Sequence, residues 1–174
     1  MQDNAQIEQP LTTPDRPKLP HVQRCKVCIF TLAGMDLIAD VSGYAPAGAQ
    51  YNSITPARLL DTRATGETID GFAQGGGAIV ADSELSLDVG GRGGVPDGAV
   101  AVAINVTVSG AEGFGYITVW PCGTPRPLSS NVNYAPGVTT ANLVMPGLGS
   151  GGTVCFYSLA TTDLIVDVSG YFPA

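Results

Sequence analysis

The residues that could carry out chemistry in this chain of 174 residues are few. His21 is the only histidine, so a Ser-His-Asp or Cys-His catalytic device would depend on it. It lies in a proline-rich stretch, which offers no rigid frame for a catalytic site. Asp163 and Asp167 would lie about 13 Å apart on a strand, which is too far for the acid and nucleophile of a retaining glycosidase. We therefore predict that the protein is not an enzyme and has no catalytic residue, no cofactor and no metal site.

Four cysteines, Cys25, Cys28, Cys122 and Cys155, are candidates for disulfide bonds. Cys25 and Cys28 have the C-x-x-C spacing of a redox motif or of half a zinc site, but no second such pair follows. We therefore expect the cysteines to have a structural role, as one or two disulfide bonds or as buried thiols. A bond between Cys122 and Cys155 would join two predicted strands. Side chains i and i+3 on a strand face opposite ways, so a Cys25–Cys28 bond would need a bend; otherwise Cys28 would pair with another molecule.

Charged residues recur near both ends of the region that follows Tyr51. Asp167 alternates with valines in a strongly apolar segment, and we interpret it as the partner of Arg58 or Arg63 in a structural ion pair. The alternative is a calcium ion bound by Asp61, Asp163 and Asp167. No dense acidic loop supports that alternative.

Three aromatic residues, Tyr116, Trp120 and Tyr134, could form a platform for a sugar ring. The competing interpretation, which we favour, is that Trp120 covers the edge of a sheet beside Pro121.

Composition and periodicity indicate an all-β protein. The chain has 23 glycines and 13 prolines but two lysines, and no segment shows a helical period. Apolar side chains at every second position from Val100 to Val108 predict a half-buried strand with its valine face inward. We expect antiparallel strands in a β-sandwich or jelly-roll-like module. The predicted strands are Arg58–Asp61, Ala78–Asp82, Leu85–Val89, Val100–Ser109, Tyr116–Trp120, Asn131–Tyr134, Thr140–Met145, Val154–Leu159 and Leu164–Ser169.

A turn at Pro136-Gly137 predicts one hairpin register. It places Asn131 opposite Asn142, and Asn133 opposite Thr140 on the same face. We expect these asparagines to form a polar seam or to point at a ligand, because a buried amide is costly without hydrogen bonds.

An internal repeat organises the chain. Residues 27–47 (VCIFTLAGMDLIADVSGYAPA) match residues 154–174 (VCFYSLATTDLIVDVSGYFPA) at 14 of 21 positions without a gap. Cys28 aligns with Cys155, an offset of 127 residues, which is also the length of residues 48–174. We therefore divide the chain into an extended proline-rich tether (1–22), an orphan β-hairpin that copies the C-terminal hairpin (23–47), and one complete β-sandwich repeat (48–174).

Four strings in the sequence resemble a β-rich module that occurs, often in tandem, in large secreted and cell-surface bacterial proteins. The strings are SITPARLLDTR (53–63), GVPDGAVAVAINVT (94–107), SNVNYAPG (130–137) and DLIVDVSGYF (163–172). The resemblance implies an extracellular or cell-surface location and tandem arrays, occasionally attached to secreted hydrolases, and implies no activity. The extra copy at 27–47, which has no body of its own, departs from the pattern of a single module.

The orphan copy leads to a hypothesis of function. An isolated hairpin is marginal in water, and burying six apolar side chains is worth about 10 kcal/mol before entropy is subtracted. We predict a non-enzymatic structural or adhesive module that self-associates by β-strand addition into a filament or array. The alternative is a carbohydrate-binding module that anchors secreted proteins to polysaccharide. The self-association residues are Val27, Ile29, Leu32, Leu37, Ile38 and Val41.

The charge balance limits the other partners. A formal net charge of −7 argues against nucleic acid, and no apolar run is long enough to insert into a membrane. The expected partners are other copies of the chain and polysaccharide.

Overall fold

The computed structural model describes residues 50–174, in which there are eight β-strands and no helix. The prediction of an all-β protein is confirmed for this region. The predicted tether and the orphan hairpin lie outside the described residues.

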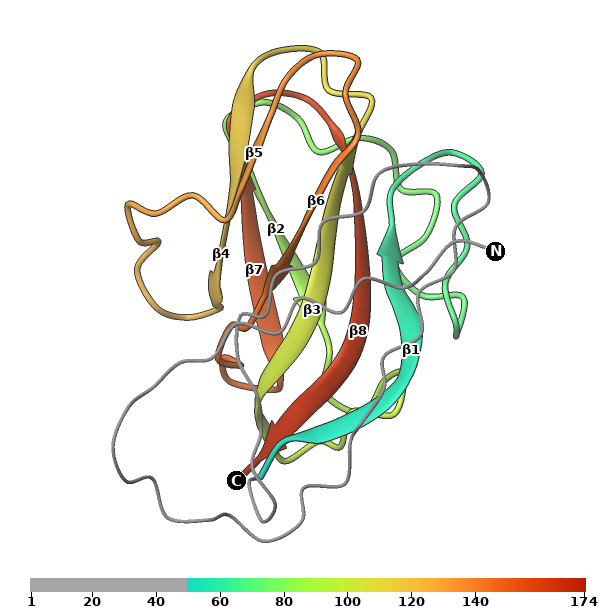
Figure 1. Cartoon of the computed structure of the whole chain (residues 1–174), viewed down its shortest axis with the longest axis vertical. Helices are drawn as coiled ribbons and strands as arrows, with labels where there is room; N and C mark the ends of the chain where they lie inside the picture. The colour runs from blue at the N-terminus through green and yellow to red at the C-terminus, as the bar shows by residue number, and fades with distance from the viewer. Residues whose placement is uncertain (1–49) are drawn as a thin grey trace, which may run out of the picture. The chain divides into compact units, whose positions relative to one another are not determined.

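The strands form two antiparallel four-stranded sheets, which are stacked face to face in Figure 1. The strand order, with the first and last strands adjacent in one sheet, is that of a jelly roll. The first sheet has the order β1 (Asn52–Asp61), β8 (Asp163–Pro173), β3 (Ala99–Ser109) and β6 (Thr140–Val144). The second sheet has the order β2 (Ser83–Asp88), β7 (Thr153–Ser158), β4 (Gly115–Pro121) and β5 (Val132–Tyr134).

The core lies between the two sheets and follows from the alternation of side chains. In β3, Val102 to Val108 turn their large apolar side chains inward as predicted. Val100, which we expected on the same face, is 50% exposed because a register shift between Ala99 and Ala101 makes it an extra residue in β3. Phe156 of β7 and Ile117 of β4 fill the core from the second sheet.

A bulge explains two adjacent buried leucines in β1. Arg58 pairs with Asp167 and Leu60 pairs with Val166, so Leu59 is an extra residue in β1. The bulge lets both Leu59 and Leu60 enter the core, which strict alternation would forbid. It also leaves Arg58 beside Asp167.

One predicted strand is absent. Residues 78–82 do not form a strand, and only Ile79 makes a bridge, to Thr162. Three glycines precede this segment, and Asp82 has a positive φ of 56°, so the backbone turns there instead of extending.

The Pro136-Gly137 turn forms, but it does not make a hairpin. β5 pairs with β4 in the second sheet, whereas β6 pairs with β3 in the first, so the chain crosses between sheets. Asn131 and Asn142 are therefore not register partners. They still meet, because the Asn142 side-chain amide donates to the Asn131 carbonyl oxygen at 2.7 Å and so links the sheets, while Asn133 is exposed.

The last two strands also differ from a hairpin. β7 pairs with β2 and β4, and β8 pairs with β1 and β3, so the two strands cross from one sheet to the other. Each has a neighbour on both sides. This pair, residues 153–173, is hereafter the central strand pair.

Candidate functional site

Four charged residues lie together where β1 meets β8. Asp61, at the end of β1, is fully buried and accepts hydrogen bonds from Arg63 (Nη2 to Oδ2, 2.7 Å; Nε to Oδ1, 2.9 Å) and from Arg58 (3.2 Å). Arg58 also donates from Nε to Asp167 Oδ1 at 2.8 Å. The structure thus joins Asp167 to Arg58, whereas Arg63 pairs with Asp61.

The electrostatics of this cluster favour the charged forms of Asp61, Arg58 and Arg63. Hydrogen bonds from Arg63 hold the pKa of the Asp61 carboxyl below its ordinary value. The hydrogen bond to Asp167 raises the pKa of Arg58. A Cβ at Gly66 would lie 2.6 Å from the Asp61 carboxyl carbon, so the loop after β1 can close over this carboxylate only with glycine there. The arrangement clamps β1 to β8.

Asp163 does not join the cluster. Its Oδ1 accepts a hydrogen bond from Thr62 Oγ1 at 2.8 Å. Within residues 50–174 no group of three His, Cys, Asp or Glu side chains is placed to hold a metal ion. The calcium alternative, with Asp61, Asp163 and Asp167 as ligands, therefore has no support in this part of the chain.

Cys122 and Cys155 form a disulfide bond in the second sheet. Cys122 follows β4 and Cys155 lies within β7, at a sequence separation of 33. The bond fixes the start of the loop that runs from Cys122 to Ser130. Cys25 and Cys28 lie outside the described residues.

The six predicted self-association residues also lie outside the described residues, but their counterparts in the central strand pair do not. Five of the six counterparts are buried, and Leu159, the counterpart of Leu32, is 42% exposed in the turn between the strands. The buried counterparts are Val154, Phe156, Leu164, Ile165 and Val168, which match Val27, Ile29, Leu37, Ile38 and Val41.

The three predicted aromatic residues do not form one platform. Tyr134 is 5% exposed and belongs to the core, where its hydroxyl group contacts Ser158 Oγ at 2.8 Å. Trp120 is 4% exposed, and its Nε1 donates to the Thr124 carbonyl oxygen. Tyr116 alone of the three reaches the surface, where its ring lies 5.8 Å from that of Tyr157.

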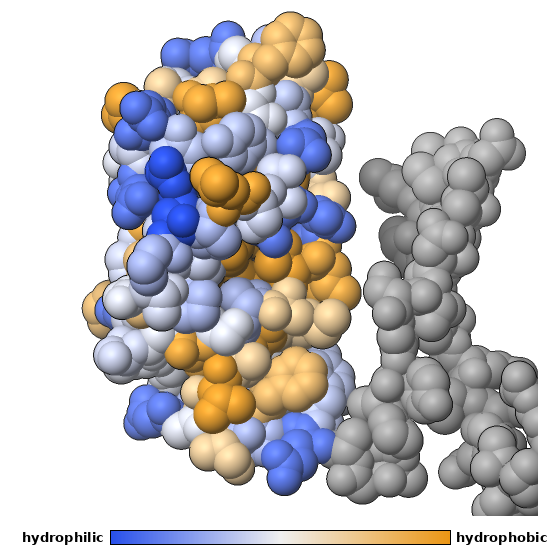
Figure 2. Space-filling view, turned by 90° about the vertical axis from the view of Figure 1, so that its left-hand side faces the viewer, coloured by the Kyte–Doolittle hydropathy of each residue, from blue (hydrophilic) through white to orange (hydrophobic). Residues whose placement is uncertain are grey.

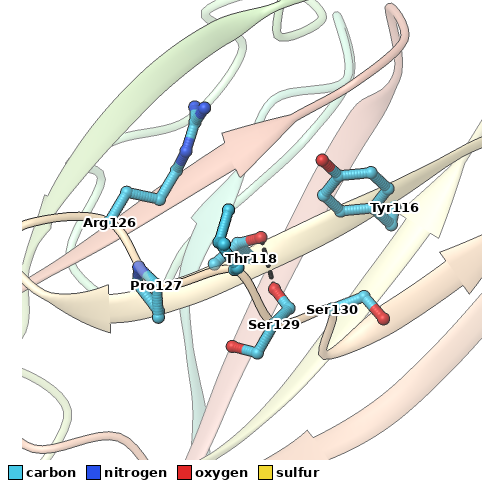
Figure 3. Close-up of a pocket in the computed structure, with 7 residues that line it drawn as sticks. Tyr116, Thr118, Arg126, Pro127, Ser129 and Ser130 are labelled. Carbon is cyan, nitrogen blue, oxygen red and sulfur yellow. Dashed lines mark hydrogen bonds between the residues drawn. The ribbon is translucent and has the colours of Figure 1, made fainter.

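Tyr116 lines a pocket of about 300 Å³ on the outer side of the second sheet. β4 contributes Tyr116 and Thr118, and the loop after Cys122 contributes the rest of the lining. Figure 3 shows Arg126 and Tyr116 at opposite ends, with the other side chains between them. The loop residues are Arg126, Pro127, Leu128, Ser129 and Ser130.

Sequence reasoning missed the loop side of this pocket. Arg126 lies over the ring of Tyr157, 3.7 Å from its centroid, and pairs with Glu84 at 3.4 Å. The one signal in the sequence was Arg126, a single cation between two prolines. Its position in the sequence gives no indication that it contacts Tyr157, which lies in a distant strand. We name the seven lining residues the outer-face pocket.

The surface beside this loop carries hydrophobic residues in several separate groups among hydrophilic ones (Figure 2). Leu128, on the loop, is fully exposed. The described residues contain no helix long and apolar enough to cross a membrane.

No model of a known protein family matches the chain, and no curated protein matches it.

Proposed function

We propose that this protein is a non-enzymatic structural or adhesive module of the bacterial exterior, and that it self-associates by β-strand addition through residues 27–47 into a filament or array. The observation that carries the proposal is the position of the central strand pair. Residues 27–47 copy two strands that each have neighbours on both sides and whose apolar side chains are buried. A segment with that pattern needs strand partners and an apolar surface to cover.

The copy is a poorer fit than the resident pair for the position between the sheets. Val166 and Phe156 are fully buried, and the copy has Ala39 and Ile29 in their places. Val to Ala alone removes two buried methyl groups, which is worth about 1.5–2 kcal/mol before any cavity is counted. The resident pair therefore keeps its place, and the copy is left to associate with another molecule.

The edge of β6 is the best acceptor among the four edge strands. β1 contains Pro56, and the loop that follows hydrogen-bonds to its second half through Ile69 and Gly75. β2 carries Glu84 and Asp88, and β5 has three residues. Proline, charge and short length all discourage strand addition.

β6 (TANLV) has no charge and no proline, and Leu143 and Met145 beside its edge are exposed. A strand from residues 36–44 of another copy would extend the first sheet there. Because that addition joins the N-terminal segment of one molecule to the body of the next, it is head-to-tail and does not close by itself.

Light scattering over a range of concentrations tests the proposal. We expect the mean mass of the full chain to rise with concentration, and residues 48–174 to stay at the mass of one chain. Leu143→Lys in the full chain should lower the association, since a lysine on an edge opposes pairing. Leu159→Lys, at an exposed leucine away from the β6 edge, is the matched control. A full chain that stays monomeric at every concentration contradicts the proposal.

The described disulfide supports an extracellular location, because such bonds persist in oxidising compartments. The fold does not decide the function, since jelly rolls serve as both capsid and lectin domains.

A further inference from the structure

The outer-face pocket is held in shape before any ligand arrives. The Thr118 hydroxyl group donates to the Ser129 carbonyl oxygen at 2.6 Å, a bond drawn in Figure 3. Beyond it, the Asn131 side-chain oxygen accepts a hydrogen bond from the Val119 backbone N–H at 2.8 Å, and the Asn131 backbone N–H donates to the Ile117 carbonyl oxygen at 2.8 Å. The C-terminal end of the loop is thus held to β4 by three hydrogen bonds.

The other end and the middle of the loop are fixed as well. Cys122 is bonded to Cys155, and Trp120 donates from Nε1 to the Thr124 carbonyl oxygen at 3.2 Å. The guanidinium group of Arg126 stacks on Tyr157, an arrangement typical of a cation–π contact. A loop held this firmly loses little conformational entropy on binding, which favours affinity.

The lining combines an aromatic ring with hydroxyl groups. Tyr116 is half-buried and presents an apolar ring, whereas Ser129 and Ser130 are exposed and leave their hydroxyl groups open to a ligand. A sugar ring has the matching surfaces, with C–H groups that pack on an aromatic face and hydroxyl groups that exchange hydrogen bonds. A volume of about 300 Å³ lies at the small end of ligand pockets and suits one or two sugar rings.

The charges around the pocket favour a neutral ligand. Arg126 is the one charged residue in the lining, and Glu84 pairs with it at 3.4 Å. Asp82 accepts a hydrogen bond at 2.7 Å from the hydroxyl group of Tyr157, the residue on whose ring Arg126 stacks. The repulsion of an acidic sugar by the two carboxylates would exceed its attraction to the one guanidinium group.

We infer that the outer-face pocket binds an uncharged saccharide of one or two rings, with Tyr116 as the stacking residue and Ser129 and Ser130 as hydrogen-bonding residues. The site lies on the second sheet and its loop, whereas the β6 edge belongs to the first sheet. The two sites therefore share no residue, and the one hydrogen bond that the described part of the chain shows between them runs from the Asn142 side-chain amide of β6 to the Asn131 carbonyl oxygen, next to the pocket.

A glycan array of neutral and uronic saccharides, probed with the full chain, tests the inference, and titration follows with each neutral sugar that is bound. Trp120, the only tryptophan, reports on the loop by its fluorescence because its Nε1 is bonded to Thr124. We expect Tyr116→Ala to weaken binding at least tenfold. Tyr51→Ala is the matched control, because Tyr51 forms a similar aromatic pair, with Phe172, at the first sheet.

Three results would overturn the inference. They are the absence of binding to any neutral saccharide, binding that Tyr116→Ala leaves unchanged, and binding that Tyr51→Ala weakens equally. A preference for uronic saccharides would overturn the choice of a neutral ligand. Ser130→Ala, at an exposed position that leaves the fold intact, supplies a second variant and should weaken binding without altering the unfolding temperature.

Discussion

Asp61→Asn removes the charge of one buried carboxylate, and we expect it to destabilise the protein substantially. Asp61 is fully buried and accepts charged hydrogen bonds from Arg63 at 2.7 and 2.9 Å and from Arg58 at 3.2 Å. Such bonds are each worth roughly 1.5–3 kcal/mol, but both arginines are partly exposed and can turn to water after the change. We therefore expect a loss of about 2–4 kcal/mol in the free energy of unfolding.

Urea unfolding followed by circular dichroism measures this loss. For a body of this size, about 3 kcal/mol corresponds to a fall of roughly 10 °C in the unfolding temperature. Asp167→Asn is the matched control, because Asp167 is partly exposed and pairs with Arg58 alone, so that about 1 kcal/mol is expected. The reasoning is refuted if Asp61→Asn changes the free energy of unfolding by less than 0.5 kcal/mol, or by no more than the control does.

Three further predictions concern pH, redox state and the repeat. Arg92 lowers the pKa of Asp70 to about 2, and Arg63 lowers the pKa of Asp61, so the stability that these two carboxylates provide is complete above the unfolded-state pKa of about 4 and is lost as the pH falls towards about 2. The unfolding temperature should therefore be constant from about pH 7 to about pH 5 and should fall below about pH 4. An unfolding temperature that stays constant down to about pH 2 contradicts this prediction. Reducing the disulfide at Cys122 should cost about 3–4 kcal/mol for a separation of 33 residues, and an unchanged unfolding temperature in reductant contradicts it. A chain that ends at residue 152 lacks the central strand pair, and we expect residues 27–47 to take its place, within one molecule or between two. Peptide mapping should then find a disulfide bond between Cys28 and Cys122. An unfolded chain without that bond would show that residues 27–47 are not equivalent to the central strand pair.

The sequence predicted the strands well where side-chain alternation was unbroken, as from Val102 to Val108. It failed at Ala78–Asp82, where three preceding glycines and a positive φ turn the backbone. It also placed β5 and β6 in one hairpin, because a tight turn at Pro136-Gly137 looks the same whether the next strand joins the same sheet or the opposite one. Strand patterns record which face is apolar, and they do not record which sheet a strand joins.

The candidate sites show the same limit. The sequence predicted that Asp167, a charged residue in an apolar strand, would pair with Arg58 or Arg63, and the structure shows that the partner is Arg58. The outer-face pocket could not be predicted from the sequence, because it depends on the contact between Arg126 and Tyr157 over the second sheet. The loop and the disulfide bond determine that contact, and no periodicity in the sequence indicates it. Trp120 and Tyr134 were candidates for a sugar platform, an interpretation that we did not favour, because aromatic residues serve equally in cores and in binding sites.

Hydrogen–deuterium exchange of residues 27–44 in the full chain tests the central claim most directly. If these residues add as strands to another molecule, their amides should be slow to exchange at concentrations where the mass is high, and fast at dilutions where a single chain remains. Leu143→Lys should restore fast exchange at high concentration. Fast exchange across this segment in associated protein would contradict strand addition and leave residues 48–174 as an independent sandwich.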